Sequence, residues 1–594
     1  MIEQNLQQAV AGALKRLYGI EVSPDTVVLQ ATKKEFVGDY TVVVFPYVKQ
    51  ARKSPEQVAN ELGAAVKETV AEVADFNVIK GFLNFSVDDA YWVRFVSDEA
   101  ADPDFGITKP DPSASPVVVE YSSPNTNKPL HLGHIRNNLL GWSVSELLAA
   151  NGANVKKVNL VNDRGIHICK SMLAWLRYGN GETPESSGMK GDHLVGKYSV
   201  EFDKHYKEEV SQLTAQGMDE EEAKKQAPLM VEAQQMLKRW EEGDPEIRDL
   251  WTKMNGWVYA GFDETYRKMG VGFDKIYYES NTYLLGKELV QKGLDMGVLF
   301  RKDDGSVWCD LTADGLDRKL LLRSDGTSVY ITQDLGTAER RFSEFSLDSH
   351  VYVVGDEQNY HFQVLKLILG KLGYGWAKDI FHLSYGMVEL PEGKMKSREG
   401  TVVDADDLIE KMYQEAKATS EESGKLEGLE EEQKEELYRM IGLGALKYFI
   451  LKVDPKKKML FNPKESIDFN GNTGPFIQYT HARIKSILRK AEERGFQGAI
   501  SPSFEPSAKE IRLIKLLNTF PQKIQDAAAD FSPAVIANYS YDLAKEFNQY
   551  YHDTPVLREE NAETLKARLV LLEIFASVLE KAMGILGIRL PDRM

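Results

Sequence analysis

The stretch PVVVEYSSPNTNKPLHLGHIRNN, from Pro116 to Asn138, decides the fold. Its first six residues are a mostly apolar run, which predicts a short buried strand. Small turn residues follow as a loop, and apolar residues at helical spacing then predict a helix from about His134 to the Asn-Gly pair at 151–152. The next strand is predicted at Val155–Val161. Strand, helix and strand in this order predict the first unit of a doubly wound parallel (Rossmann-like) α/β sheet.

The rest of the chain divides into regions of different composition. At 594 residues, the chain requires several domains rather than one core. The sequence predicts an N-terminal α+β module over residues 1–110, a Rossmann-like domain over 116–400 with a helical insertion at about 175–260, a connecting helical segment over 401–445, and an all-α C-terminal domain over 446–594.

Periodicity and turn signals predict the individual elements. Leu6, Val10, Leu14 and Leu17 share one face of an N-terminal helix. A second helix is predicted near Pro55–Val73, and strands at Asp39–Pro46, Phe82–Val87, Ser306–Thr312, Lys319–Gly326, Ser328–Thr332, His350–Gly355 and Ile380–Leu390. The last five of these strands would supply the second half of the sheet, and no strand is predicted after residue 402.

Composition narrows the class of protein. Hydrophobic residues make up 43% and charged residues 27% of the chain, which is typical of a globular protein. The sequence has no run of about 18 apolar residues, and its N-terminal helix lacks the pattern of a signal peptide, so we expect no membrane association and a cytoplasmic location. Only Cys169 and Cys309 are present, which excludes a disulfide framework and a cysteine-rich zinc site. The net charge of −17 argues against a general nucleic-acid binder but allows local basic patches.

Two motifs point to a bound nucleotide. His131 and His134, with Gly133 between them, directly follow a strand and open a helix, where ring N–H groups and the helix dipole favour phosphate. Glycine at this position leaves room for a flat ring against the backbone. A second basic stretch, EGKMKSREGTVVD (Glu392–Asp404), could balance charge on a departing pyrophosphate, although basic surface loops are common.

Together these motifs resemble the paired signatures of class I aminoacyl-tRNA synthetases. The resemblance narrows to arginyl-tRNA synthetase and spans nearly the whole chain. It is carried by the stretches VEYSSPNTNKPLHLGHIRNN, LLRSDGTSVYITQDLGTA, FNGNTGPFIQYTHARIKSI and GILGIRLPDRM, and by GDY (Gly38–Tyr40) and GFLNF (Gly81–Phe85) in the first module.

The acidic residues beside the predicted site allow two interpretations. A guanidinium is bound best by carboxylates in a fixed fork. Glu120 ends the first strand, and Asp334 lies four residues after Tyr330. Asp334 could equally cap a helix. His361, at a predicted helix start, is either a core residue or a supporting residue of the site.

The family resemblance implies specific roles. Tyr330 and Asp334 would bind the guanidinium with help from Glu120, while Asn125 and Gln358 would bind the α-carboxylate and α-amino groups. His131, His134, Lys128 and Lys394 would be the catalytic residues. ATP, accompanied by Mg²⁺ and with no protein-bound zinc, would contact His131, Gly133, His134, Gly355, Met387, Val388, Lys394, Ser397 and Arg398.

The lysine loop departs from the family signature. In K-M-S-K-S the fourth position is a lysine, but here it is Ser397, between Lys396 and Arg398. Family members with this departure carry a lysine just ahead of the histidine motif, and Lys128 occupies that place. We therefore expect Lys128 to supply part of the missing phosphate contact.

The resemblance also implies a tRNA(Arg) partner. The all-α domain would bind the anticodon, with Tyr479 and Arg483 as candidate contacts, and the first module would reach the tRNA elbow, with Asn84 as a candidate. Aromatic residues at helical spacing, such as Phe547 and Tyr550, are more often core residues. We expect a monomer.

Three alternative functions have arguments against them: another class I synthetase, a small-molecule nucleotidylyltransferase and a catalytically dead synthetase relative. Synthetases for valine, isoleucine and leucine carry a large editing insertion for which this chain has no room, and cysteinyl enzymes bind zinc through cysteines that are absent here. A small nucleotidylyltransferase would not need the helical C-terminal third. A catalytically dead synthetase relative that regulates RNA would not need intact His131, His134 and Lys394.

Overall fold

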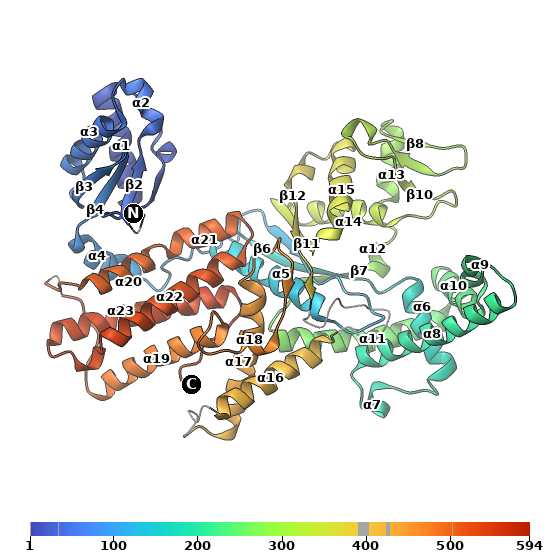
Figure 1. Ribbon diagram of the computed structural model, residues 1–594. Coiled ribbons are helices and arrows are strands. Elements are labelled where there is room, and N and C mark those ends of the chain that lie inside the picture. The colour runs from blue at the N-terminus through green and yellow to red at the C-terminus, as the bar shows by residue number, and fades with distance from the viewer. Residues whose placement is uncertain (1, 34, 390–402, 423–427, 502) are drawn as a thin grey trace. The chain divides into compact units, whose positions relative to one another are not determined.

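The computed structural model describes residues 2–33, 35–389, 403–422, 428–501 and 503–594, and Figure 1 labels its helices and strands. These residues form two compact units. The first contains Met1–Phe105, Ile487–Thr519 and Glu546–Ser577, and the second contains Gly106–Ser486, Phe520–Lys545 and Val578–Met594.

The N-terminal part of the first unit is an antiparallel sheet with helix α3 packed on β3 and β4 (Figure 1). The strands hydrogen-bond in the order β1-β2-β4-β3. The predicted strand at Phe82–Val87 is confirmed as β4. The elements are α1 (Ile2–Tyr18), β1 (Leu29–Ala31), β2 (Tyr40–Val43), α2 (Phe45–Ala51), α3 (Pro55–Thr69), β3 (Val73–Ile79), β4 (Phe82–Val87) and α4 (Asp89–Phe95).

Two details of this module differ from the prediction. Leu6, Val10 and Leu14 are buried as expected, but Leu17 is 41% exposed and does not belong to the apolar face of α1. The strand predicted to reach Pro46 ends at Val43 instead, because proline fits the first turn of a helix and α2 begins there.

The second unit is built on a five-stranded parallel sheet with the strand order β12-β11-β5-β6-β7. The strands are β5 (Val117–Glu120), β6 (Val155–Val161), β7 (Lys275–Tyr278), β11 (Ser349–Gly355) and β12 (Ile380–Tyr385). Helix α5 (Leu132–Ala150) connects the central strands β5 and β6, and all pairings between neighbours are parallel. The predicted doubly wound sheet and its first strand–helix–strand unit are confirmed.

The second half of this sheet is smaller than predicted. Strand β7 was not predicted, and the strands β8 (Leu299–Arg301), β9 (Val307–Cys309) and β10 (Lys319–Leu322) form a separate antiparallel sheet. The segment Ser328–Thr332 is not a strand, because helix α14 (Tyr330–Phe345) begins inside it and the Thr332 hydroxyl donates to the Leu321 carbonyl.

The insertion after β6 is helical, as predicted. Helix α8 packs against both α6 and α11. The helices of the insertion are α6 (Ile166–Tyr178), α7 (Pro184–Ser187), α8 (Gly191–Ala215), α9 (Glu220–Gln226), α10 (Pro228–Glu241) and α11 (Pro245–Met269). Beyond β7 the chain continues with α12 (Glu279–Thr282), α13 (Lys287–Asp295) and, after β11, α15 (Asn359–Lys371).

Among its described residues, the C-terminal third is mostly helical and contains one short strand. Strand β13 (Val388–Glu389) pairs with β14 (Met459–Leu460), so the expectation of no strand after residue 402 is wrong there. Among the described residues, no helix has the length and apolar character needed to span a bilayer. The helices are α16 (Ala405–Glu422), α17 (Glu431–Leu451), α18 (Pro463–Ser466), α19 (Gly474–Glu493), α20 (Ala508–Asn518), α21 (Phe520–Ala529), α22 (Pro533–Asp553) and α23 (Ala562–Ile585).

Candidate active site

The histidine motif forms the N-terminal turn of α5. His131 is the N-cap residue, and its Nδ1 accepts a hydrogen bond from the Gly133 N–H at 3.1 Å. The His131 N–H donates in turn to Nδ1 of His134 at 3.2 Å. These reciprocal bonds satisfy two amide donors at the helix start, as a serine–glutamate capping box does. The helix therefore begins at Leu132, two residues before the predicted start.

The packing of the two rings explains the glycine between them. The ring centroids of His131 and His134 are 4.0 Å apart. A Cβ atom on Gly133 would lie 2.9 Å from Cε1 of His131, closer than unstrained contacts allow. Glycine at 133 therefore leaves room for the His131 ring against the backbone, and its role in nucleotide binding stays a prediction.

Both imidazoles are neutral at physiological pH. Burial, reinforced by the nearby Lys128 ammonium, lowers the pKa of His131 to about 4. Burial, with the neighbouring His131 and Lys128, also holds the pKa of His134 well below its usual range. Because Nδ1 of each ring accepts a backbone N–H, the proton of each neutral ring is on Nε2. The pair therefore offers two Nε2–H donors without carrying a positive charge.

The turn between β5 and the motif has a strained backbone. Ser122 (φ 79°) and Ser123 (φ 46°) adopt the left-handed region, which costs a residue with a side chain about 1–2 kcal/mol. The Ser122 N–H donates to Oδ1 of Asn137 at 2.6 Å, and the Ser123 N–H donates to Oδ1 of Asn159 at 3.0 Å. These bonds hold a sharp reversal at the carboxyl edge of the sheet, where ligands bind in open α/β folds.

Arg136 ties the second turn of α5 to the far edge of the site. Its buried guanidinium donates to the carbonyl oxygens of Met387 at 3.2 Å, Pro455 at 3.2 Å and Lys457 at 2.8 Å. The basic stretch around Lys457 therefore lies beside β13 and contacts more than the C-terminal helices. The Met387 carbonyl is engaged within the protein.

The other residues predicted to contact ATP divide into two groups. Gly355 is the last residue of β11, at the same carboxyl edge as the end of β5. The Met387 side chain, just before β13, is 41% exposed, and the Val388 side chain in β13 is buried. Three predicted residues lie outside the described residues: Lys394, Ser397 and Arg398.

Tyr330 and Asp334 lie one turn apart at the start of α14. Residues four apart share a helix face, so their side chains project from the same side. Tyr330 is 76% exposed. Nε2 of His361, in the first turn of α15, lies 2.6 Å from Oδ2 of Asp334 and orients that carboxylate. This contact supports the interpretation of His361 as a supporting residue.

Glu279 is an acidic neighbour that was not predicted from the sequence. It is the first residue of α12, directly after β7. Burial is the main cause that raises the pKa of Glu279 to about 7; Arg164 opposes the rise, and the carboxylates of Asp163 and Asp334 add to it. The available signal was a carboxylate immediately after the run KIYY at 275–278. It was missed because that strand was not predicted.

The surroundings of Glu279 fix its position. Asp163 is buried and accepts hydrogen bonds from the Ser280 N–H at 2.8 Å, the Ser280 hydroxyl at 2.7 Å and the Tyr259 hydroxyl at 2.8 Å. A Cβ atom on Gly336 of α14 would lie 2.3 Å from the Gly286 nitrogen, so α14 approaches the chain after α12 very closely. This approach brings the carboxylate-bearing turns of the two helices together.

The remaining residues predicted to bind arginine are arranged differently. Glu120 is buried, and its carboxylate pairs with the buried guanidinium of Arg341 and accepts from the Ser123 hydroxyl at 3.3 Å. Its carboxylate therefore already has partners within the protein, and its help in binding the guanidinium stays a prediction. Asn125 and Gln358 are exposed, at the start of the motif loop and just before α15.

The structure separates the residues predicted to contact tRNA. Asn84 is fully buried: its Oδ1 accepts a hydrogen bond from the Thr41 hydroxyl (2.6 Å), and its amide donates to Oδ1 of Asn77 (3.0 Å). Its contact with tRNA stays a prediction. Tyr479 and Arg483 share one face of α19 and are half-buried, with the guanidinium carbon 4.8 Å from the ring centroid. Phe547 and Tyr550 are core residues, as their spacing suggested.

Three regions of the chain match known families. Residues 107–462 match tRNA synthetases class I (R), catalytic domain. Residues 4–87 match the arginyl tRNA synthetase N terminal domain, and residues 477–594 match the DALR anticodon binding domain.

Similar proteins agree with these matches. The chain is 61% identical to the arginine–tRNA ligase of Bacteroides thetaiotaomicron and 54% identical to that of Porphyromonas gingivalis, with 100% of each chain covered. Its fold matches the arginyl-tRNA synthetase of Thermus thermophilus with a TM-score of 0.81 at 28% identity, again over 100% of both chains. The chain therefore belongs to the arginyl-tRNA synthetase family of class I aminoacyl-tRNA synthetases.

Proposed function

We infer that this chain is an arginine–tRNA ligase that uses ATP. The arginine carboxylate attacks the α-phosphate of ATP and forms arginyl-adenylate, with pyrophosphate leaving. A hydroxyl of the terminal tRNA ribose, the 2′-hydroxyl in class I enzymes, then attacks the activated carbonyl and gives arginyl-tRNA and AMP. The observation that carries this function is the pair of neutral imidazoles with Nε2–H donors at the start of α5, in a chain of this family.

The first step needs no side-chain nucleophile, because both reacting groups belong to the substrates. Catalysis then consists of positioning and of stabilising negative charge that develops on the phosphate. His131 and His134 would donate Nε2–H bonds to the α-phosphate oxygens. Two neutral donors suit this role, because they do not hold the product by charge. Lys128 and Lys394 would receive the pyrophosphate.

The ATP site would extend along the carboxyl edge of the sheet. Gly355 ends β11 there, and the nucleoside would bind beside it. Because the Met387 carbonyl is bound by Arg136, recognition of adenine at the start of β13 would rely on the remaining backbone groups of Met387 and Val388. Gly133 would allow close approach of phosphate, Ser397 and Arg398 would contact the triphosphate, and Mg²⁺ would accompany ATP as part of the substrate.

The guanidinium would bind between Asp334 and Glu279, beside Tyr330. A planar cation paired with two carboxylates gains charge-assisted hydrogen bonds in a fixed geometry. The raised pKa of Glu279 is consistent with this assignment. Burial is its main cause, and a guanidinium bound there would favour the ionised carboxylate and offset the smaller repulsion from Asp334. Glu120 would act indirectly, by holding the turn at Ser123 that precedes Asn125. Gln358 would bind the α-amino group with Asn125.

The tRNA would contact both terminal regions. The DALR match at residues 477–594 supports anticodon binding by the C-terminal helices, with Tyr479 and Arg483 on α19 as candidate contacts. We also propose domain limits at residues 110, 116, 400 and 446, a monomeric state and a cytoplasmic location. Lys128 would supply part of the phosphate contact that is missing at Ser397.

Charging of total tRNA with each of the twenty amino acids tests this function. We expect ATP-dependent charging with arginine only, and loss of at least about 100-fold in rate for His134→Gln, since it removes a donor to the reacting phosphate. Charging with another amino acid would contradict the assignment. Pyrophosphate exchange with and without tRNA gives a second readout, because family members need bound tRNA to activate arginine. A chain that binds tRNA without exchange would be an RNA-binding regulator instead.

A further inference from the structure

The segment just after the lysine loop pairs with the histidine motif. The Leu132 N–H donates to the Val403 carbonyl at 3.0 Å, and the Ala405 N–H donates to the Leu130 carbonyl at 3.0 Å. Between these bonds, residues 131 and 404 face each other in an antiparallel bridge. Residues 403–405 therefore hold the backbone on both sides of His131.

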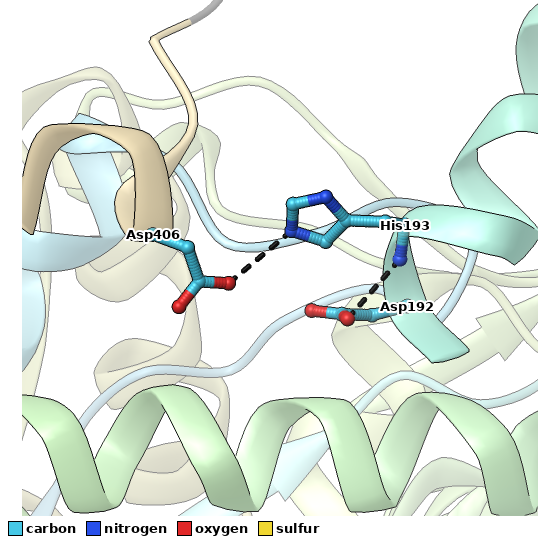
Figure 2. A group of neighbouring side chains, drawn as sticks. All are labelled: Asp192, His193 and Asp406. Carbon is cyan, nitrogen blue, oxygen red and sulfur yellow. Dashed lines mark hydrogen bonds and ion pairs between the residues drawn. The ribbon is translucent and has the colours of Figure 1, made fainter. Parts of the chain in front are cut away.

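The next residue of this segment is anchored in the helical insertion. Figure 2 shows the Asp406 carboxylate, at the start of α16, turned towards His193 at the start of α8. Nε2 of His193 lies 3.2 Å from Oδ2 of Asp406, and the Lys190 ammonium donates to the same oxygen at 2.6 Å. Lys268 of α11 reaches the other oxygen at 3.3 Å. Asp406 is largely buried, so this is not a solvent-exposed ion pair.

Lys190 is the centre of this cluster. Its ammonium donates to Oδ2 of Asp406, to Oδ2 of Asp192 at 3.1 Å and to the Thr265 hydroxyl at 2.6 Å. A lysine ammonium has three N–H donors, so these three partners satisfy it completely. Asp192 is fully buried, and a Cβ atom on Gly261 of α11 would lie 2.3 Å from its Oδ1, which shows how tightly the two helices enclose it.

The geometry also resembles a metal site, since ligand atoms of Asp192, His193 and Asp406 lie within 4.8 Å of one another. However, the Lys190 ammonium already bridges the two carboxylates. A metal ion there would have to displace a cation whose three hydrogen bonds are all made. We therefore interpret the cluster as an internal ion-pair network rather than a ligand site.

Helix α8 contacts the motif loop at a second place. A Cβ atom on Gly196 would lie 2.8 Å from Cδ of Pro129, so the helix backbone lies directly against the loop. One turn further, the Asn127 amide donates to the Ser199 hydroxyl at 3.4 Å. The insertion thus touches the loop before His131 directly and the chain opposite His131 through Asp406.

We propose that Lys190 and His193 are positioning residues for the adenylation step: through Asp406 they hold residues 403–405 against the histidine motif and so fix His131 at the phosphate site. Neither residue touches substrate. This inference rests on the proposed function. It means that the helical insertion fixes the position of the first turn of α5.

Kinetics of ATP–pyrophosphate exchange in the presence of tRNA test the proposal, with kcat and the KM for ATP and for arginine measured separately. We expect Lys190→Gln and Asp406→Asn to lower kcat about 10- to 100-fold, since a small displacement of a reacting group has such effects. The KM for arginine should stay within twofold. The matched control is Lys197→Gln, on α8. This variant removes a surface ion pair with Glu182 (2.8 Å) and should leave kcat unchanged.

The double variant shows whether Lys190 and Asp406 affect kcat through the same interaction or independently of each other. If Lys190 acts through Asp406, Lys190→Gln with Asp406→Asn should be no slower than the slower single variant. The proposal would be overturned if the fold-losses in kcat of the two single variants multiplied in the double variant. It would also be overturned if Lys197→Gln lost as much kcat as Lys190→Gln. Should Lys190→Gln fail to fold, His193→Asn removes the contacts of that imidazole with Asp406 (3.2 Å) and Asp404 (3.3 Å) and carries the same test. Failure of the proposed function would be distinguishable from failure of this proposal, because the unaltered chain would then not charge tRNA with arginine.

Discussion

Among single residues, Glu279 should make arginine recognition depend on pH. Its pKa of about 7 means that its carboxyl is only partly ionised at neutrality. A guanidinium needs the ionised form, so kcat/KM for arginine should fall about tenfold per pH unit below about 7 and level off above it. Glu279→Gln should lower kcat/KM about 10- to 100-fold and remove this inflection. Glu288→Gln, at an exposed position of α13, is the control; an unchanged inflection in Glu279→Gln would contradict the assignment.

The same residue should cost stability. The pKa of Glu279 is raised from 4.5 to about 7 in the folded chain, so the folded chain binds more protons than the unfolded chain between these values. Stability therefore falls as pH rises through this window. Thermal unfolding of Glu279→Gln should occur at a higher temperature than that of the unaltered chain at pH 8, and the gap should close near pH 4.5. A variant that melts lower at pH 8 would show that the ionised carboxylate is stabilised by a partner instead.

Gly133 should separate activity from stability. Alanine in a helix is favoured over glycine by about 1 kcal/mol, but the added methyl group would meet the His131 ring. Gly133→Ala should therefore keep its melting temperature within a few degrees while kcat for exchange falls at least about tenfold. Gly256→Ala, on α11 with open space around it, is the control and should be fully active. Full activity of Gly133→Ala would mean that ring placement is not critical.

At the scale of elements, Arg136 is the link between α5 and the edge of the site. Its guanidinium bonds three carbonyl oxygens from two segments. Arg136→Met should lower the free energy of unfolding by at least about 1.5–3 kcal/mol, the worth of a charge-assisted hydrogen bond. Arg136→Lys should recover only part of this, because an ammonium lacks the planar fork. Urea unfolding measures the difference, and equal stability of both variants would contradict the role of the fork.

Elements were predictable where periodicity and local chemistry agree. The strand–helix–strand unit around α5 combines an apolar strand, a capped helix and a turn at Asn-Gly, and it was predicted to within two residues. Ser328–Thr332 is rich in β-branched residues and was predicted as a strand, but tertiary contacts make it the start of α14. Strand β7 is four residues long and follows a long polar insertion, so its signal was too short to detect.

At the scale of the whole molecule, family membership and domain order follow from motifs that are long and continuous in sequence. The site does not, because its parts come from segments far apart in the chain. The histidine pair was predictable, since both rings and their glycine lie within four residues. The engagement of Glu120 by Arg341 was not, because the two residues are separated by 221 positions and meet only through the sheet. The electrostatic interaction of Glu279 with Asp334 and the contacts of Asp406 with the insertion also join residues far apart in sequence, so they could not be predicted either.

The most direct test of the account is a crystal structure with tRNA and a non-hydrolysable analogue of arginyl-adenylate. The account predicts Nε2 of His131 and His134 within hydrogen-bond distance of the group that replaces the α-phosphate, and the guanidinium between the carboxylates of Asp334 and Glu279. An analogue whose phosphate mimic lies away from both imidazoles, or whose guanidinium faces neither acid, would contradict it.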